Sequence, residues 1–95
     1  MTSRVARLGG RLFRYQLTLL LQEVRRPMTV AEIVEALRRL DVDVPGRASK
    51  TISDALRWEI QKGRVRRAAP ATYVFVRMPP STGRWMRSEL RNAQW

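Results

Sequence analysis

The stretch from residue 47 to residue 76 constrains the fold most, because a strongly amphipathic segment ends there at a glycine and two short extended segments follow. Within residues 49–62 the apolar side chains recur at the spacing of one helical face. They are Ile52, Ala55, Leu56 and Ile60. Gly63 stands where a residue in the left-handed conformation ends many helices. The pattern predicts a helix over 49–62 that is anchored along one face and exposes the other.

The two extended segments predict a β-hairpin directly after this helix. Residues 64–68 and 72–76 are short and are separated by Ala69-Pro70-Ala71, a turn signal. Three arginines, Arg64, Arg66 and Arg67, lie on the first segment. The hairpin is therefore expected to be strongly basic.

Two further helices are predicted upstream. Residues 11–24 carry an apolar face that ends before Arg25-Arg26-Pro27. That face consists of Phe13, Leu17, Leu20, Leu21 and Val24. Leu12 and Leu19 lie off this face, so we expect them to pack on a partner chain.

The helix over 29–40 begins with a capping box, in which Thr29 is the N-cap and Glu32 the third helical residue. Its apolar face consists of Val30, Ile33, Val34, Leu37 and Leu40. Glu35 can pair with Arg38 or Arg39 one turn later. Asp41 and Asp43 follow, and we expect them to be solvated loop charges rather than metal ligands.

The chain divides into three parts by composition. Residues 1–10 form a flexible basic arm, residues 11–77 hold the helices and the hairpin, and residues 78–95 form a tail that opens with Met78-Pro79-Pro80. A short last helix is predicted over 83–95. Its apolar side chains, Trp85, Met86 and Trp95 among them, must either fold back on the domain or meet another subunit.

The charge balance predicts a polyanionic partner. The 95 residues include 19 Lys or Arg against 8 Asp or Glu, a net charge of +11. The excess is concentrated in residues 1–26 and 47–77. The chain has no Cys and no His, which removes disulfides, thiolate nucleophiles and the usual zinc sites. We predict no enzymatic activity, no cofactor, no membrane span and a cytoplasmic, nucleoid location.

The order of three helices and a hairpin resembles the winged helix-turn-helix family. The segments PMTVAEIVEAL, SKTISDALRWEIQKGRV and YVF carry the resemblance, which covers about residues 11–76. It implies a mainly α fold with a small β-hairpin: a three-helix core plus a wing, followed by the tail helix. It also implies that the third helix enters the major groove of DNA and that the wing lies along the backbone. The wing tip Ala-Pro-Ala departs from the glycine or basic residue common there, which argues against deep minor-groove insertion.

The polar face of the third helix supplies the candidate DNA contacts. Arg47, Lys50, Thr51 and Arg57 are candidate readers of base edges. Ser49 and Gln61 add donors for phosphates or bases, and Arg64, Arg66 and Arg67 are candidate phosphate clamps. Ser53 can also reach a phosphate oxygen. We expect Asp54 to pair with Lys50 or Arg57 and Trp58 to cover the base of the wing.

The sequence therefore predicts a sequence-selective double-stranded DNA-binding protein, a transcriptional regulator or nucleoid-associated factor. A homodimer through the first helix or the tail would match a two-fold DNA site. The alternative is a winged-helix protein-interaction module within a transcription assembly, with Trp58, Trp85 and Trp95 as anchors.

Overall fold

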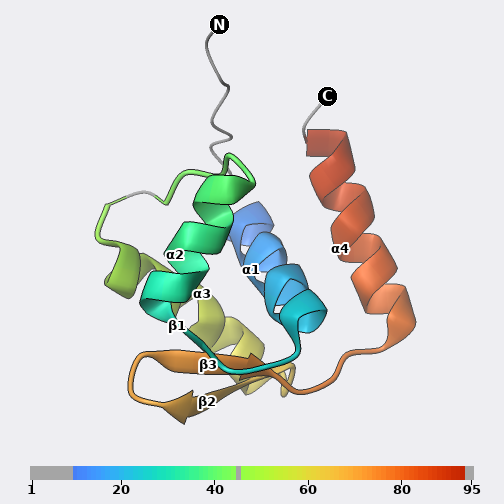
Figure 1. Cartoon of the computed structure of the whole chain (residues 1–95). Coiled ribbons are helices and arrows are strands. Elements are labelled where there is room, and N and C mark those ends of the chain that lie inside the picture. The colour runs from blue at the N-terminus through green and yellow to red at the C-terminus, as the bar shows by residue number, and fades with distance from the viewer. Residues whose placement is uncertain (1–9, 45, 94–95) are drawn as a thin grey trace, which may run out of the picture.

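The computed structural model describes residues 10–44 and 46–93, and this part of the chain forms four helices and three short strands (Figure 1). The helices are α1 (Gly10–Val24), α2 (Val30–Arg39), α3 (Ala48–Gln61) and α4 (Pro80–Ala93). The strands are β1 (Met28–Thr29), β2 (Val65–Ala69) and β3 (Thr72–Phe75). The fold is mainly helical with a small antiparallel sheet, as the sequence predicted. Of the predicted basic arm, only Gly10 belongs to the described residues, and it begins α1.

The main core lies where α1, α2 and α3 meet the sheet. The predicted helices over 11–24, 29–40 and 49–62 are each confirmed to within one residue at either end. The predicted face of α1 is buried, with Leu17 and Leu21 fully enclosed. Ile33 and Leu37 from α2 and Ile52 and Leu56 from α3 are likewise fully buried. These side chains fix which face of α3 is left to solvent.

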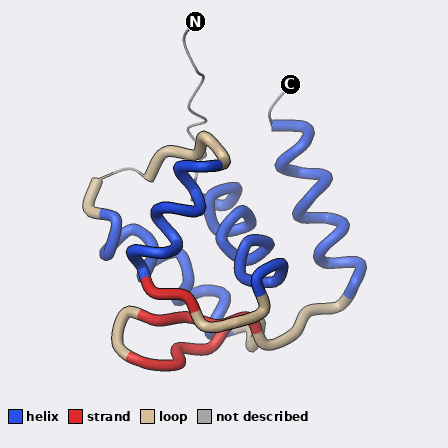
Figure 2. Tube along the Cα trace, viewed as in Figure 1, coloured by secondary structure: helices blue, strands red, loops and turns tan. Residues whose placement is uncertain are grey.

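The sheet has the strand order β1-β3-β2, and both pairs are antiparallel (Figure 2). The hairpin of β2 and β3 was predicted, whereas β1 was not. Met28 pairs with Tyr73 and Thr29 with Thr72. Two residues are too few to show a strand periodicity, so this pairing left no signal in the sequence. It connects the start of α2 to the hairpin.

The capping box at the start of α2 is confirmed. The Glu32 backbone N–H donates to the Thr29 hydroxyl at 3.1 Å, and the Thr29 N–H donates to the Glu32 carboxylate at 2.9 Å. Glu35 pairs with both Arg38 and Arg39, also as predicted. Leu40 does not join the apolar face, because it is the C-cap residue of α2 and is 52% exposed.

The predicted apolar face of α3 was wrong at its C-terminal end. Ile60 is 40% exposed, whereas Glu59 is completely buried. At 3.6 residues per turn, Glu59 lies almost directly above Ile52 after nearly two turns, while Ile60 is rotated by about 80°. The helical repeat therefore places Glu59 on the buried side, and its carboxylate needs hydrogen-bond or ion-pair partners inside the protein.

The tail folds back on the domain and packs along α1 (Figure 1). Tyr15, Met86 and Leu90 form a second buried cluster, against which Leu12 and Leu19 pack. The α1 side chains that we expected to meet a partner chain are thus covered by α4. The helix begins at Pro80 rather than at residue 83, because the fixed φ of proline suits the first helical turn. Trp85 is 57% exposed, and Trp95 lies outside the described residues.

No helix in the described part of the chain has both the length and the apolar character that a membrane crossing requires.

Candidate nucleic-acid interface

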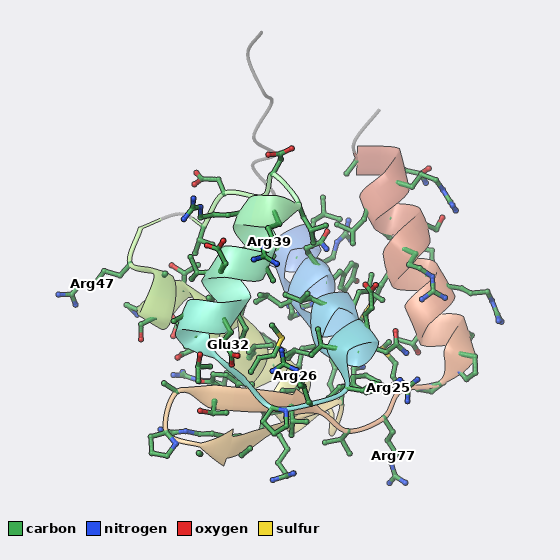
Figure 3. The ribbon with its side chains drawn as sticks, viewed as in Figure 1. Arg25, Arg26, Glu32, Arg39, Arg47 and Arg77 are labelled. Atoms are coloured by element: carbon green, nitrogen blue, oxygen red, sulfur yellow. The ribbon has the colours of Figure 1, made fainter. Side chains whose placement is uncertain are left out.

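The outer face of α3 presents the predicted polar and basic side chains. Lys50, Arg57 and Gln61 are all exposed. The steps from Arg47 to Lys50, from Lys50 to Arg57 and from Arg57 to Gln61 are three, seven and four residues, which keeps these side chains on one side of a helix. Arg47 is the N-cap residue, and Figure 3 shows its side chain reaching away from the body of the protein. Because Ile52 and Leu56 are buried on the opposite side, this face cannot turn inward.

An acidic residue divides this basic face. Asp54 accepts a hydrogen bond from Lys50 at 3.0 Å and lies 3.8 Å from Arg57. The predicted pairing is therefore confirmed, and it involves both partners. All three side chains are at least half exposed, so the pairs are weak and exchange readily with solvent. A phosphate or a base edge can compete with Asp54 for either cation.

The small hydroxyl residues of α3 differ in their availability. Ser49 is exposed and Thr51 is half-buried. Ser53 lies 3.1 Å from the hydroxyl of Tyr73 and thereby joins α3 to β3, so its hydroxyl has a partner within the protein, and its contact with phosphate stays a prediction. In the described structure, the side chain of Arg47 makes no capping bond to the first turn of α3, which also carries no acidic residue. The N–H groups of that turn suit an external anion.

Arg64 is held inside the protein rather than on the outer surface of the hairpin. Its Nη1 group donates to both carboxylate oxygens of Glu59 at 3.2 Å, and its side chain is only 19% exposed. The same carboxylate lies 3.3 Å from Nε of Arg14 and 2.9 Å from the hydroxyl of Thr18. Arg64 is therefore not an exposed cation like Arg66 and Arg67, and its role as a phosphate clamp stays a prediction. This ionic cluster joins α1, α3 and the start of β2.

Arg66 and Arg67 remain as exposed cations of the hairpin. Successive side chains of a strand point to opposite faces, so the two arginines project on both sides of β2. The strand lies at the edge of the sheet, because β3 pairs with it on one side only. The turn places Ala71 at a φ of +53°, a conformation that a non-glycine residue seldom adopts.

Trp58 does not cover the base of the hairpin. It is 55% exposed and its ring lies 5.6 Å from the Arg14 guanidinium of α1. The prediction of its position was wrong, because the inward turn of Glu59 rotates Trp58 toward α1. There it borders a hollow between α1 and α3 that Thr51 and Asp54 also line.

Sequence reasoning missed Glu59 and Arg14, the two residues that organise the inner side of this region. The signal for Glu59 was present, since it follows Ile52 by seven residues, but only apolar side chains were assigned to the buried face. Among the described residues, no group of three or more possible metal-ligating side chains comes together. The chain was also compared with protein-family models, curated proteins and solved structures, and none of them matches it.

Proposed function

We propose that this protein binds double-stranded DNA sequence-selectively through a winged-helix module and acts as a transcriptional regulator or nucleoid-associated factor. In this proposal α3 lies in the major groove, and the hairpin of β2 and β3 is the wing that follows the phosphate backbone. Three helices followed by a hairpin is the arrangement on which the resemblance to the winged-helix family rests.

The observation that carries the proposal is the pairing of two exposed basic surfaces on adjacent elements. One is the face of α3 with Arg47, Lys50 and Arg57, and the other is the hairpin with Arg66 and Arg67. A helix that exposes basic side chains at its N-cap and in its middle, and that is anchored by the fully buried Ile52 and Leu56, has the dimensions that the major groove admits. Basic side chains on the neighbouring strand suit the flanking phosphates.

The proposal assigns separate tasks to these residues. Arg47, Lys50, Arg57 and Gln61 carry donors that reach base edges, so they provide selectivity. Arg66 and Arg67 neutralise phosphates and provide affinity that depends little on sequence. Ser49, Thr51 and the first-turn N–H groups of α3 hold the phosphate next to the helix start.

A homodimer would use the outer surface of α4, because the second apolar side of α1 is already covered within the chain. Trp85, at 57% exposure, is the largest apolar side chain on that helix's outer surface. A two-fold DNA site would follow from such a dimer.

The exposed tryptophans also support a second function, that of a protein-interaction module within a transcription assembly. Trp58 and Trp85 are each more than half exposed, and tryptophan is enriched among residues that anchor protein interfaces. An acidic protein partner would then occupy the basic face of α3. Trp58→Ala would weaken that complex, while DNA would not shift in a gel.

Fluorescence anisotropy with a labelled random-sequence duplex separates the two functions. We expect the double variant Arg66→Ala/Arg67→Ala to bind at least tenfold more weakly than the wild type. Arg38→Ala/Arg39→Ala is the matched control, because it removes the same charge from exposed positions on α2, which the proposal assigns neither to DNA nor to the dimer. An equal loss of duplex affinity in both variants would mean that the effect comes from net charge alone. No binding of the duplex by the wild type at low salt would refute DNA binding.

A further inference from the structure

Two adjoining hollows lie where the end of α3 meets the segment that leads into α4. Their volumes are about 430 Å³ and about 490 Å³, and both are lined by Lys62, Arg64 and Thr82. We call the joined surface the linker hollow. Arg14 and Trp85 line one part, and Arg77 lines the other. Volumes of this size lie within the range of small-ligand sites, roughly 300–1,000 Å³.

The linker hollow is strongly positive. Four basic side chains line it, Arg14, Lys62, Arg64 and Arg77, and none of the described residues that line it is acidic. The carboxylate of Glu59 is fully buried and contacts Arg14 at 3.3 Å and Arg64 at 3.2 Å. The lining of the hollow therefore carries four positive charges, and the carboxylate of Glu59 offsets one of them.

Two of these cations are themselves largely buried. The side chains of Arg14 and Arg64 are 20% and 19% exposed, and both contact the single charge of Glu59. A buried charge without a partner is unfavourable, so these two guanidinium groups carry a positive charge that one carboxylate does not balance. An anion in the hollow would supply the second negative charge.

Glu59 also fixes how these guanidinium groups are presented. It is contacted by Nη1 of Arg64 and by Nε of Arg14. A guanidinium has five N–H donors in a rigid fork, so Nη2 of Arg64 and both Nη groups of Arg14 remain as further donors on residues that line the hollow. Donors held in place before binding lose little entropy when the ligand arrives.

The rim adds donors from two other segments. Lys62 follows α3 and is exposed, and Arg77 extends outward from the link between β3 and α4 (Figure 3). Ser81 and Thr82 bring hydroxyl groups from the first turn of α4. Fork-shaped guanidinium groups together with a lysine and hydroxyl groups are the donor set that binds phosphate oxygens.

We propose that the linker hollow binds a phosphate group, with Arg14 and Arg64 oriented by Glu59 as its inner ligands and Lys62 and Arg77 as its outer ones. The phosphate can belong to a free oligophosphate or to the backbone of a nucleic acid. The hollow shares none of its residues with the α3 face and the exposed hairpin arginines assigned above to DNA. The proposal therefore does not depend on that function.

The test compares Lys62→Ala/Arg77→Ala with Arg38→Ala/Arg39→Ala. Each variant removes two exposed cations, and α2, which carries Arg38 and Arg39, contributes no residue to the hollow. Inorganic pyrophosphate is titrated into each protein by calorimetry at low salt, and a labelled random duplex is titrated by anisotropy over a salt series. Thermal unfolding of each variant confirms that it is folded.

Tenfold or greater loss of pyrophosphate affinity in the Lys62/Arg77 variant, with the control unchanged, identifies a site for a free phosphate compound. If instead the Lys62/Arg77 variant loses duplex affinity and the control does not, the ligand is a backbone phosphate. The slope of log K against log salt should then decrease in magnitude by about two. Equal affinities of the two variants for both probes, or no measurable binding of either probe, would overturn the proposal. Binding of pyrophosphate without binding of the duplex would refute DNA binding and leave the phosphate site standing.

Discussion

Replacing the buried carboxylate of Glu59 by an amide tests how the hairpin is attached to the helices. Glu59→Gln keeps the shape of the side chain and removes one negative charge. Glu59 is completely buried, accepts hydrogen bonds from Arg64 at 3.2 Å and lies 3.3 Å from Arg14. In the variant, both guanidinium groups lose the only carboxylate that they contact among the described residues.

The size of the effect follows from this burial. Removing one partner of a buried ion pair costs about 3–5 kcal/mol. The side chains of Arg14 and Arg64 are about one-fifth exposed, so water recovers part of that loss. We expect a destabilisation of about 2–3 kcal/mol, and each kcal/mol lowers the Tm of a domain this small by about 4–8 °C.

Urea unfolding followed by circular dichroism measures this difference. Glu35→Gln is the matched control, since Glu35 also contacts two arginines, at 3.3 and 3.7 Å, but is half exposed. Its loss is expected to change the free energy of unfolding by less than about 0.5 kcal/mol. If Glu59→Gln were as stable as Glu35→Gln, the ionic cluster would not hold the hairpin to α1 and α3.

Three further predictions concern other parts of the structure. The Thr29 backbone N–H that donates to Glu32, together with nearby Arg26, lowers the Glu32 pKa below its ordinary value of 4.5. Glu32 therefore stabilises the fold above pH 4.5, and this contribution is lost as the pH falls through the lowered pKa. A Glu32→Ala variant should show a flatter decline of Tm in acid than the wild type, and an unchanged decline would contradict the assignment. Met86 is 1% exposed, so Met86→Ala should lower the free energy of unfolding by about 2–4 kcal/mol and speed amide hydrogen exchange in α4 more than in α2. An equal increase of exchange in both helices would mean that this contact does not hold α4. Asp54→Asn should raise the affinity for random duplex DNA by about fivefold, because it removes a charge that repels phosphate and releases Lys50 and Arg57. A lower affinity of the variant would instead show that Asp54 accepts a hydrogen bond from a base.

The helices could be predicted closely because each has one continuous apolar face and a clear end signal. Gly63 has a φ of +76°, as expected of a residue that ends a helix. Thr29 and Glu32 form the capping box that their spacing indicated. These signals are local, so they are readable without knowledge of what packs against them.

The errors arose where a side chain is placed by distant neighbours. Glu59 is buried because Arg14 of α1, which lies far away in the sequence, and Arg64, which lies beyond the end of α3, neutralise it. The same contact removes Arg64 from the outer surface. Tyr73 engages Ser53 in a comparable way, and α4 covers the second side of α1. Periodicity alone does not report such pairings, since it treats each element as if its partner were water or a uniform core.

The salt dependence of duplex DNA binding tests the central proposal most directly. Anisotropy titrations of a labelled random duplex at several salt concentrations give the slope of log K against log salt. If α3 and the hairpin together neutralise about five phosphates, the slope is close to −4.5, and Arg66→Ala/Arg67→Ala reduces its magnitude by about two. A slope near zero, or no binding at low salt, would contradict the assignment of these two surfaces to DNA.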